Sequence, residues 1–300
     1  MIEISVVVPC RITNREELAT LQEALHRILH QSIDRSRYEV VLVDDGSDIN
    51  LCDELKVLPE YADMVSIIRH QKKGPAAARN NGIMRSKGET ILFLGSDVLI
   101  QHNLLEAHLE VHGNNNGVVV INQVRAGEKT VLGKEYLEVN VGGFHEGVKY
   151  DMPSGAAFCT SCVSVRRQYI ETEMFDDNFA FAAYEDTDVG YRLHRNGIKV
   201  MVAKRTSATH DHIHSVRSLR ERSRRCGMAY AYLVKKHPKL RLGINCIPGS
   251  CSFYAKSVLY GVSFPIAYIL SRLPFRYMAK CGMEAMCKYE FLRGVAKAKA

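Results

Sequence analysis

One short stretch, Thr90 to Asp97, constrains the fold more than any other part of the chain. Its first five residues, TILFL, carry no charge and favour extended structure, which is typical of a strand buried on both faces of an α/β sheet. Gly95, Ser96 and Asp97 follow directly. Because open α/β sheets bind ligands at the carboxyl ends of their strands, Asp97 is placed to hold a divalent cation against a diphosphate. Taken alone, these residues also fit a turn in which Asp97 bonds its own backbone.

The chain before this stretch alternates strands with helices. Apolar runs at 4–9, 40–43 and 64–68 predict buried strands. Apolar residues at helical spacing after Thr13 and Asn14 predict a first helix, and the pair Gly74-Pro75 predicts the start of another. Strand, helix, strand is the opening of a parallel sheet.

Several polar or unusual residues fall at the ends of these strands. Pro9 closes the first strand and Asp44 and Asp45 close the second. The carboxyl ends of parallel strands meet at one edge, so we expect these residues and Asp97 on one rim, with Arg79 of the next helix nearby. A carboxylate there suits hydrogen bonding to a base or ribose, although a simple turn remains the alternative.

A second acidic run lies at Tyr184 to Gly197. Its spacing predicts a short helix with Glu185 and Asp186 in the first turn and Gly197 as the carboxyl cap. Acids in a first turn are favoured by the helix dipole alone, by about 0.3–1 kcal/mol each.

Three histidines alternate along the chain after a predicted strand at 199–202. His210, His212 and His214 would lie on one face of an extended segment, a geometry able to bind a metal. We rank His212 as the weaker metal candidate and expect His214 to contact solvent or phosphate. Polar surface on an edge strand is the alternative for all three.

Charge is divided unevenly. From residue 204 onward there are 19 Lys and Arg against 4 Asp and Glu, a net +15, whereas residues 1–203 carry 21 against 29, a net −8. A basic tail on an acidic body suits an anionic partner such as phospholipid, nucleic acid or a phosphorylated acceptor. We expect no nucleic acid, because the arginines lack base-stacking aromatic residues on a recognisable module.

The tail contains an apolar segment between Lys256 and Arg272. Its fifteen uncharged residues fall short of the roughly 20 that cross a bilayer, and Pro265 is expected to break the helix. The segment therefore suits an anionic membrane surface on which it lies flat. A helical tail packed on the catalytic body is the alternative.

Cysteine usage bears on the compartment. The nine cysteines are odd in number and scattered, which favours reduced thiols and a cytoplasmic protein. The basic tail would allow this protein to lie peripherally on the inner face of the membrane. The chain enters a strand at once, so we expect no secretion. Cys159 and Cys162 are interpreted as buried thiols of a strand at 156–165, because no second ligand pair for zinc is present.

Five motifs in order resemble the nucleotide-sugar half of family 2 glycosyltransferases of the GT-A fold. They are Ser5-Val6-Val7-Val8-Pro9, Val43-Asp44-Asp45-Gly46-Ser47, Gly74 with Ala78-Arg79-Asn80, Gly88-Glu89 and Phe93-Leu94-Gly95-Ser96-Asp97. The Glu185-Asp186 run resembles the acceptor motif of the same family. The resemblance implies a Rossmann-like α/β fold, mostly parallel and flanked by helices, over residues 1–215, with a nucleotide lobe at 1–113 and an acceptor lobe at 114–215. Residues 216–300 would form a basic, amphipathic helical extension.

The resemblance also implies an activity, namely inverting transfer of a sugar from a nucleoside diphosphate, most commonly UDP, to a hydroxyl of a carbohydrate or glycoconjugate. Asp186 would be the general base, supported by Glu185. The nucleotide would contact Pro9, Asp44 or Asp45, Arg79, Ser96 and Asp97. Asp97 and His210 would hold Mn²⁺ or Mg²⁺.

One residue departs from the family pattern. Gly95 stands where the family usually has the first aspartate of an Asp-x-Asp triplet, which puts metal affinity and donor choice in question. A protein that kept the fold and lost the chemistry, binding a membrane or a partner, is therefore an alternative. A sugar nucleotidyltransferase is another, but the residues after Pro9 lack the glycine-rich loop that it needs.

Overall fold

The computed structural model describes residues 1–55, 57, 59–126, 157–179, 181–210, 216–240, 242, 251–270 and 276–298. Its contacts divide the chain into two compact units. The sheet unit comprises Met1–Gly127, Gly142–Asn178 and Asp186–Asp211, and the helical unit comprises Glu128–Val141, Phe179–Glu185 and His212–Ala300. His212 and His214 lie outside the described residues.

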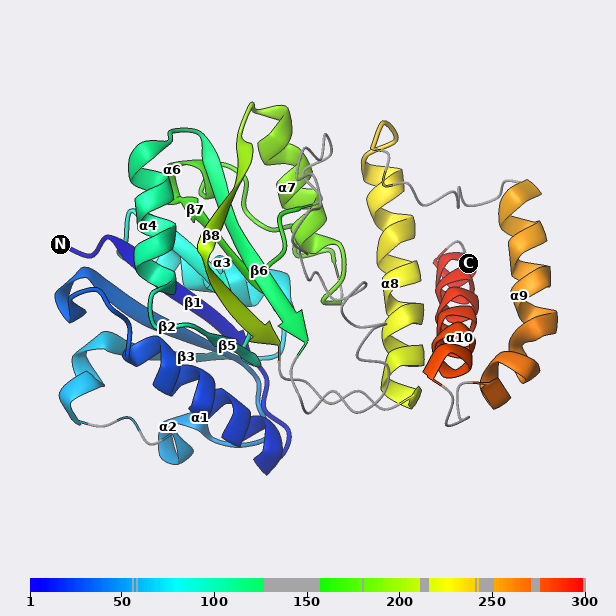
Figure 1. Ribbon diagram of the computed structural model, residues 1–300, viewed down its shortest axis with the longest axis horizontal. Helices are drawn as coiled ribbons and strands as arrows, with labels where there is room; N and C mark the ends of the chain where they lie inside the picture. The colour runs from blue at the N-terminus through cyan, green and yellow to red at the C-terminus, as the bar shows by residue number, and fades with distance from the viewer. Residues whose placement is uncertain are drawn as a thin grey trace. The chain divides into compact units, whose positions relative to one another are not determined.

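An eight-stranded sheet with the order β3-β2-β1-β4-β7-β6-β8-β5 forms the centre of the sheet unit (Figure 1). Its strands are β1 (Ile4–Cys10), β2 (Tyr38–Asp45), β3 (Val65–His70), β4 (Thr90–Leu94), β5 (Val98–Ile100), β6 (Val118–Ala126), β7 (Cys162–Arg166) and β8 (Lys199–His210). The first four in space are parallel, whereas β7 runs antiparallel to β4 and β6, and β5 antiparallel to β8. This confirms the mostly parallel sheet expected from the sequence, to which the structure adds three antiparallel pairings.

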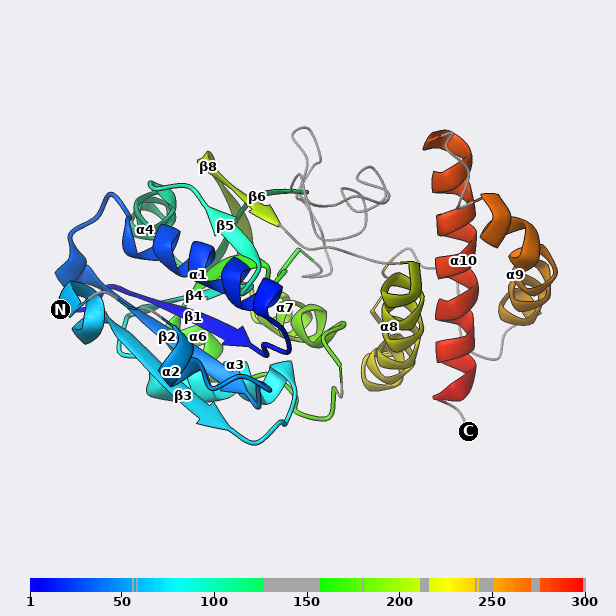
Figure 2. The same ribbon diagram turned by 90° about the horizontal axis from the view of Figure 1, so that it is seen from below.

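Helices cover both faces of this sheet (Figure 2). They are α1 (Arg15–Leu29), α2 (Leu51–Glu54), α3 (Pro75–Arg85), α4 (Leu104–Asn114), α6 (Arg167–Ile170) and α7 (Glu185–Arg195), with 3₁₀ turns at Arg35–Arg37 and Pro59–Met64. The apolar sides of α1 and the start of α4 share one core with alternate strand residues, and α3 and α7 share the core on the opposite face. Asn14 caps α1 by accepting a hydrogen bond from the Glu17 backbone N–H at 2.9 Å.

A buried polar cluster joins α4 to the sheet. The hydroxyl of Ser164 lies 2.8 Å from His108 Nδ1 and 2.8 Å from His112 Nε2, and His108 Nε2 lies 3.3 Å from Asn122 Oδ1. Burial lowers the pKa of His108 to about 3 and that of His112 to about 4. Both imidazoles are therefore neutral members of the core near neutral pH.

The predicted strand at 156–165 is shorter than expected. The ladder begins at Cys162, whose thiol is buried, whereas Cys159 lies half-buried in the turn before it. The prediction of buried strand thiols is therefore right for Cys162, whereas Cys159 lies in the turn before the strand and not within it. Thr160 and Ser161 interrupt the apolar run, and the chain turns there.

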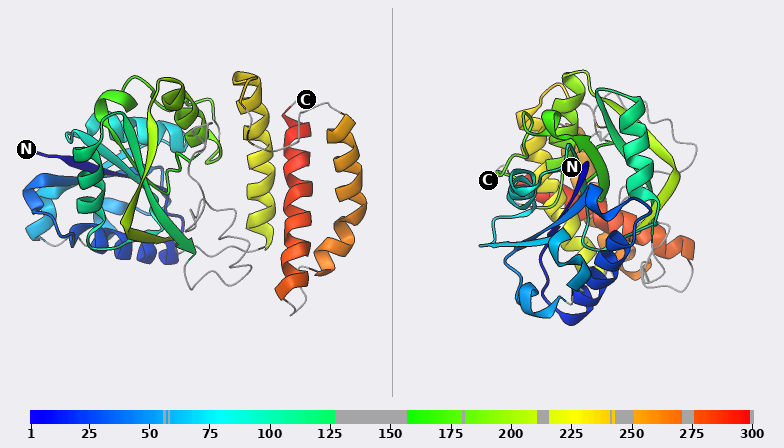
Figure 3. Two further views of the ribbon diagram at one scale, coloured as in Figure 1. Left: turned by 45° about the horizontal axis from the view of Figure 1, so that its top comes forward. Right: turned by 90° about the vertical axis from the view of Figure 1, so that its left-hand side faces the viewer.

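Three long helices dominate the helical unit, namely α8 (Val216–Lys236), α9 (Cys251–Leu270) and α10 (Arg276–Lys297) (Figure 3). Where α8 and α10 cross, two glycines allow their backbones to touch. A Cβ atom on Gly227 would lie 1.9 Å from the Phe291 carbonyl oxygen, and one on Gly294 would lie 1.9 Å from that of Arg224. Neither position can hold a side chain, so this crossing is fixed by the two glycines.

The prediction that Pro265 breaks its helix is wrong, because α9 is continuous through it. A proline inside a helix removes the hydrogen bond to the carbonyl four residues earlier and crowds that carbonyl with its ring. Here that residue is Gly261, which has no side chain to add to the crowding, and Pro265 is exposed. No helix in the described parts of the chain is long and apolar enough to cross a membrane.

The segment Phe179–Glu185 packs within the helical unit, although it leads directly into α7. Its aromatic rings contact α8 residues. The ring centres of Phe179 and Tyr232 are 4.8 Å apart in an edge-on arrangement, and those of Tyr184 and Tyr230 are 5.7 Å apart. The guanidinium carbon of Arg225 lies 5.5 Å from the centre of the Phe181 ring. Tyr184 has φ +64°, a left-handed conformation that a non-glycine residue rarely adopts. The backbone immediately before Glu185 and Asp186 is therefore strained and held in place by ring contacts.

Candidate active site

Pro9 and Asp44 are neighbours at the carboxyl edge of the sheet, where Pro9 pairs with Val43 and Cys10 with Asp44. The Asp44 side chain is buried. Its Oδ1 accepts a 2.7 Å hydrogen bond from the Ser47 backbone N–H. Its Oδ2 lies 3.6 Å from Arg69 Nε and has no hydrogen-bond partner among the described residues. One buried acceptor oxygen therefore remains for an N–H or O–H group of a ligand.

Asp45 has a different task. Its carboxylate accepts hydrogen bonds from the backbone N–H of Lys73 at 2.7 Å and of Gly74 at 3.0 Å. Gly74 has φ +97°, where glycine is favoured, and α3 begins at the next residue. Asp45 therefore fixes the start of α3, and the sequence could not separate this role from that of Asp44.

Arg79 lies on α3 with its side chain largely buried. Its guanidinium carbon is 5.4 Å from the centre of the Phe175 ring. Burial raises the pKa of the Cys159 thiol, the Asp186 carboxylate raises it further, and Arg79 opposes them. The three side chains are thus close enough to influence one another electrostatically.

Asp97 and His210 lie together. Asp97 Oδ2 is 3.3 Å from His210 Nε2, because the short strand β5 pairs Val98 directly with His210 at the end of β8. Two neighbouring ligands of an octahedral ion with bonds of roughly 2.1 Å are about 3 Å apart, so both atoms fit around one Mn²⁺ or Mg²⁺ ion. No group of three or more such ligands occurs among the residues that the structure describes.

The turn between β4 and β5 is tight around Gly95. The Gly95 N–H donates to the Ser161 carbonyl at 3.1 Å, and the Val98 N–H donates to the Gly95 carbonyl at 3.1 Å. A Cβ atom on Gly95 would lie 2.9 Å from Val98 Cγ2 and 3.0 Å from Asp97 Oδ1. Any side chain at this position would therefore press on the Asp97 carboxylate. Ser96 lies half-buried in the same turn.

Asp186 stands in the first turn of α7. Its Oδ1 accepts a 2.7 Å hydrogen bond from the Thr187 backbone N–H, and its Oδ2 accepts a longer one, 3.4 Å, from that of Thr160. Ser161, the next residue, bonds Gly95 on its other side. The turn Cys159–Ser161 thus joins the Asp186 carboxylate to the loop that carries Asp97. Sequence reasoning missed this turn, because its residues bind through their backbone.

The other acids of α7 are buried. Glu185 is nearly inaccessible to solvent. Asp188 is fully buried and accepts hydrogen bonds from Arg192 Nε at 3.0 Å and Nη2 at 2.9 Å, and Arg192 also contacts Glu173. The Asp188–Arg192 pair lies within α7, and its i, i+4 spacing is its signal in the sequence. The contact of Arg192 with Glu173 ties α7 to the chain before it.

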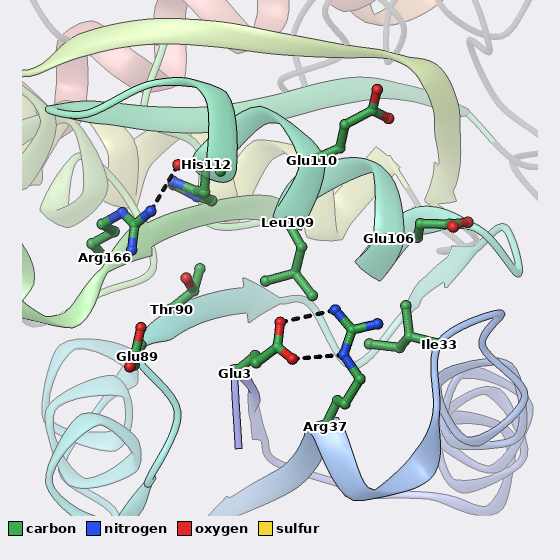
Figure 4. A pocket seen from close by; sticks show the side chains of 11 residues that line it. Glu3, Ile33, Arg37, Glu89, Thr90, Glu106, Leu109, Glu110, His112 and Arg166 are labelled. Atoms are coloured by element: carbon green, nitrogen blue, oxygen red, sulfur yellow. Dashed lines mark hydrogen bonds and ion pairs between the residues drawn. The ribbon is translucent and has the colours of Figure 1, made fainter. Parts of the chain in front are cut away.

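A cavity of about 390 Å³ lies at the amino edge of the parallel strands, away from these residues (Figure 4). Glu3 and Arg37, which line it, form two hydrogen bonds of 2.6 and 2.9 Å, and these bonds hold the pKa of Glu3 below its ordinary value. Thr90, which lines the cavity, is the first residue of β4. Asp97 comes after Leu94, the last residue of the same strand, and so lies at the opposite edge of the sheet. We therefore place the candidate active site at the carboxyl edge and not in this cavity.

Two solved structures share the fold. The S. aureus TarS 1–349 complex with UDP is 15% identical, with a TM-score of 0.54 over 100% of this chain and 92% of that one. GalNAc-T7 with UDP, GalNAc and Mn²⁺ is 16% identical, with a TM-score of 0.54 over 79% of this chain and 51% of that one. These likenesses confirm the predicted GT-A fold of the chain.

Sequence comparison gives closer relationships over shorter stretches. Poly(ribitol-phosphate) beta-N-acetylglucosaminyltransferase TarP of Staphylococcus aureus is 30% identical over 123 residues, which are 40% of this chain and 36% of TarP. The chain thus spans about a third of that curated relative. The family model described as glycosyl transferase family 2 matches residues 5–173, more than half of the chain. The chain therefore belongs to glycosyl transferase family 2.

Proposed function

We propose that the chain is an inverting glycosyltransferase that moves a sugar from a UDP-sugar to a hydroxyl of a carbohydrate or glycoconjugate acceptor. The donor is supported by the fold shared with the UDP complex of TarS. The acceptor class is supported by the name of TarP, which acts on poly(ribitol-phosphate). The cysteines are odd in number and scattered along the sequence, which supports a reducing, cytoplasmic setting.

One observation carries this proposal, namely the turn Cys159–Ser161. It contacts the Asp186 carboxylate through the Thr160 N–H and the Asp97 loop through the Ser161 carbonyl. The proposed base for the acceptor and the proposed metal ligand Asp97 are thereby held against the same three residues. Transfer between two bound substrates requires such groups to be held close together.

In the reaction, Asp186 accepts the proton of the acceptor hydroxyl. The hydroxyl oxygen bonds to the anomeric carbon as the bond from that carbon to the diphosphate oxygen breaks, and the electron pair leaves with UDP. Attack from the face opposite the leaving group inverts the anomeric configuration. When bound at Asp97 and His210, Mn²⁺ or Mg²⁺ supplies Lewis-acid neutralisation of the diphosphate charge.

The remaining residues bind and orient the donor. The free oxygen of Asp44 accepts a hydrogen bond from the base or ribose, beside the wall that Pro9 forms. Arg79 supplies positive charge near the nucleotide, and Ser96 lines the turn next to Asp97. Asp45 acts indirectly, through the start of α3, and Glu185 supports the base from within the first turn of α7.

The test is UDP release from UDP-sugars with a panel of acceptors that includes poly(ribitol-phosphate). D186N should lower turnover by about 10²–10⁴ while UDP binding persists, whereas D97A should weaken Mn²⁺-dependent UDP binding. D63N, on the exposed 3₁₀ turn before β3, is the matched control and should change neither. Turnover that D186N leaves intact would refute the assignment of the base.

Gly95 favours a second candidate, a protein that binds nucleotide or a partner and no longer transfers sugar. A Cβ atom at position 95 would meet the side chains of Asp97 and Val98, so these side chains leave little room for the acid that the family usually has there. If UDP binds but no acceptor or water accelerates its release from UDP-sugars, this candidate replaces the enzyme.

A further inference from the structure

Helix α9 exposes an entirely apolar face. Its most exposed large residues are Leu259 (63%), Val262 (76%), Ile266 (63%) and Ile269 (61%). Pro265 is the other exposed residue among those of α9 whose exposure is described, 256–257 and 259–270. A helix on the surface of a protein normally turns charged residues outward. We call these five residues the α9 stripe.

The opposite side of α9 forms the core of the helical unit. Ala267 is buried there, and Phe264 and Tyr268 pack against a cluster that includes Met283 and Met286 of α10. The guanidinium of Arg220 lies 4.9 Å from the centre of the Phe264 ring. Each of the four large stripe residues has more than 60% of its surface exposed, so the stripe is available for another surface.

We propose that the α9 stripe docks on the surface of an anionic phospholipid membrane, with α9 lying parallel to that surface. The stripe runs from residue 259 to residue 269, about 15 Å along the helix. Since no described helix is long and apolar enough to cross a bilayer, contact along one face is the geometry open to it. Apolar side chains of such a helix enter the boundary between headgroups and acyl chains.

Charge distinguishes a membrane from a second copy of the chain as the occupant. Residues 216–300 carry 17 Lys and Arg against 3 Asp and Glu, a net +14. Two such regions repel each other, whereas anionic headgroups attract each of them. The stripe is also purely aliphatic or proline, whereas contacts that stabilise protein interfaces are enriched in tryptophan, tyrosine and arginine.

Tryptophan fluorescence tests the contact directly, because the chain contains no tryptophan. I266W reports from the stripe and M84W reports from α3, where Met84 is similarly exposed at 68%. With vesicles of about two parts phosphatidylcholine to one part phosphatidylglycerol, the emission of I266W should shift to the blue and be quenched by brominated lipid. The emission of M84W should not change. Equal responses of the two reporters, or none from I266W, would overturn the proposal.

Vesicle sedimentation with I266D and M84D tests its energetics. Each variant adds one negative charge, so both change the long-range attraction to anionic vesicles equally. A difference in their vesicle affinities therefore reports burial of the stripe in the membrane. I266D should bind anionic vesicles at least about tenfold more weakly than M84D, and neutral phosphatidylcholine vesicles should bind the wild type less. Equal binding of the two variants would mean that charge alone acts and would overturn the stripe as the contact.

Sedimentation velocity of the full chain without lipid tests the competing occupant. A wild-type dimer that I266D converts to a monomer, together with loss of vesicle binding by the dimer, would assign the stripe to a second copy. The proposal predicts that the wild type and I266D are both monomers. Because lipid binding is measured without donor or acceptor, its failure is distinguishable from failure of the proposed transferase activity.

Discussion

Asp45 gives the sharpest test of how the sheet edge is built, because D45A removes its contacts with the start of α3 and, under the proposed function, leaves the nucleotide contact of Asp44 in place. The carboxylate accepts from two backbone N–H groups, those of Lys73 and Gly74. A hydrogen bond to a charged group contributes about 1.5–3 kcal/mol. Lys73 is exposed, so water can replace part of the lost bonding, and the lower value applies to each bond.

The expected loss is therefore about 3 kcal/mol, which lowers the Tm by roughly 6–12 °C for a unit of this size. Thermal unfolding followed by circular dichroism measures it. D48A is the control, since Asp48 makes one exposed 4.0 Å contact with Arg11 and should change stability by less than about 1 kcal/mol.

A second measurement separates the two adjacent carboxylates. D44N keeps an acceptor for the Ser47 N–H but replaces the free oxygen, so UDP affinity measured by titration should fall with little change in Tm. D45A should lower the Tm and change UDP affinity little. If D45A left the Tm unchanged and abolished UDP binding, Asp45 would be the nucleotide ligand and the reasoning would be wrong.

Three further outcomes follow from described contacts. His108 and His112 have pKa values of about 3 and 4 in the folded protein and about 6.5 in the unfolded chain. Between the folded and the unfolded pKa of each histidine, the unfolded chain therefore binds more protons than the folded protein. Stability is then full above pH 6.5 and falls by about 4 kcal/mol by pH 5, and urea midpoints that do not move between pH 7 and pH 5 would contradict this. G95A should push on Asp97 and raise the Mn²⁺ requirement of donor turnover about tenfold, equivalent to 1.4 kcal/mol; an unchanged Mn²⁺ titration would contradict it. G227A should destabilise the crossing of α8 and α10 by about 3 kcal/mol, and an unchanged melt would show that the helices can separate without cost.

Local pattern was sufficient for much of the fold. The apolar runs at β1, β2 and β4 are long and unbroken, so strand identity followed from them. Gly74-Pro75 located the start of α3, and Gly197, with φ +83°, ends the segment of α7 as expected.

What the sequence could not supply depends on contacts between distant segments. β5 has three residues, too few for a periodic signal, yet its pairing with β8 brings Asp97 to His210. Asp44 and Asp45 are adjacent and chemically identical, and only the position of the Lys73–Gly74 backbone distinguishes them. Pro265 was misjudged because the propensity rule treats proline as a break wherever it falls, whereas α9 continues through it.

The segment Phe179–Glu185 has a consequence for shortening the chain. It precedes the proposed base, yet its rings rest on Tyr230, Tyr232 and Arg225, which come far later in the sequence. A fragment ending before α8 would keep every motif of the family and still lose the support for the left-handed Tyr184. Recombinant fragments meant to carry out sugar transfer should therefore extend through α8, even though no recognisable signature lies there.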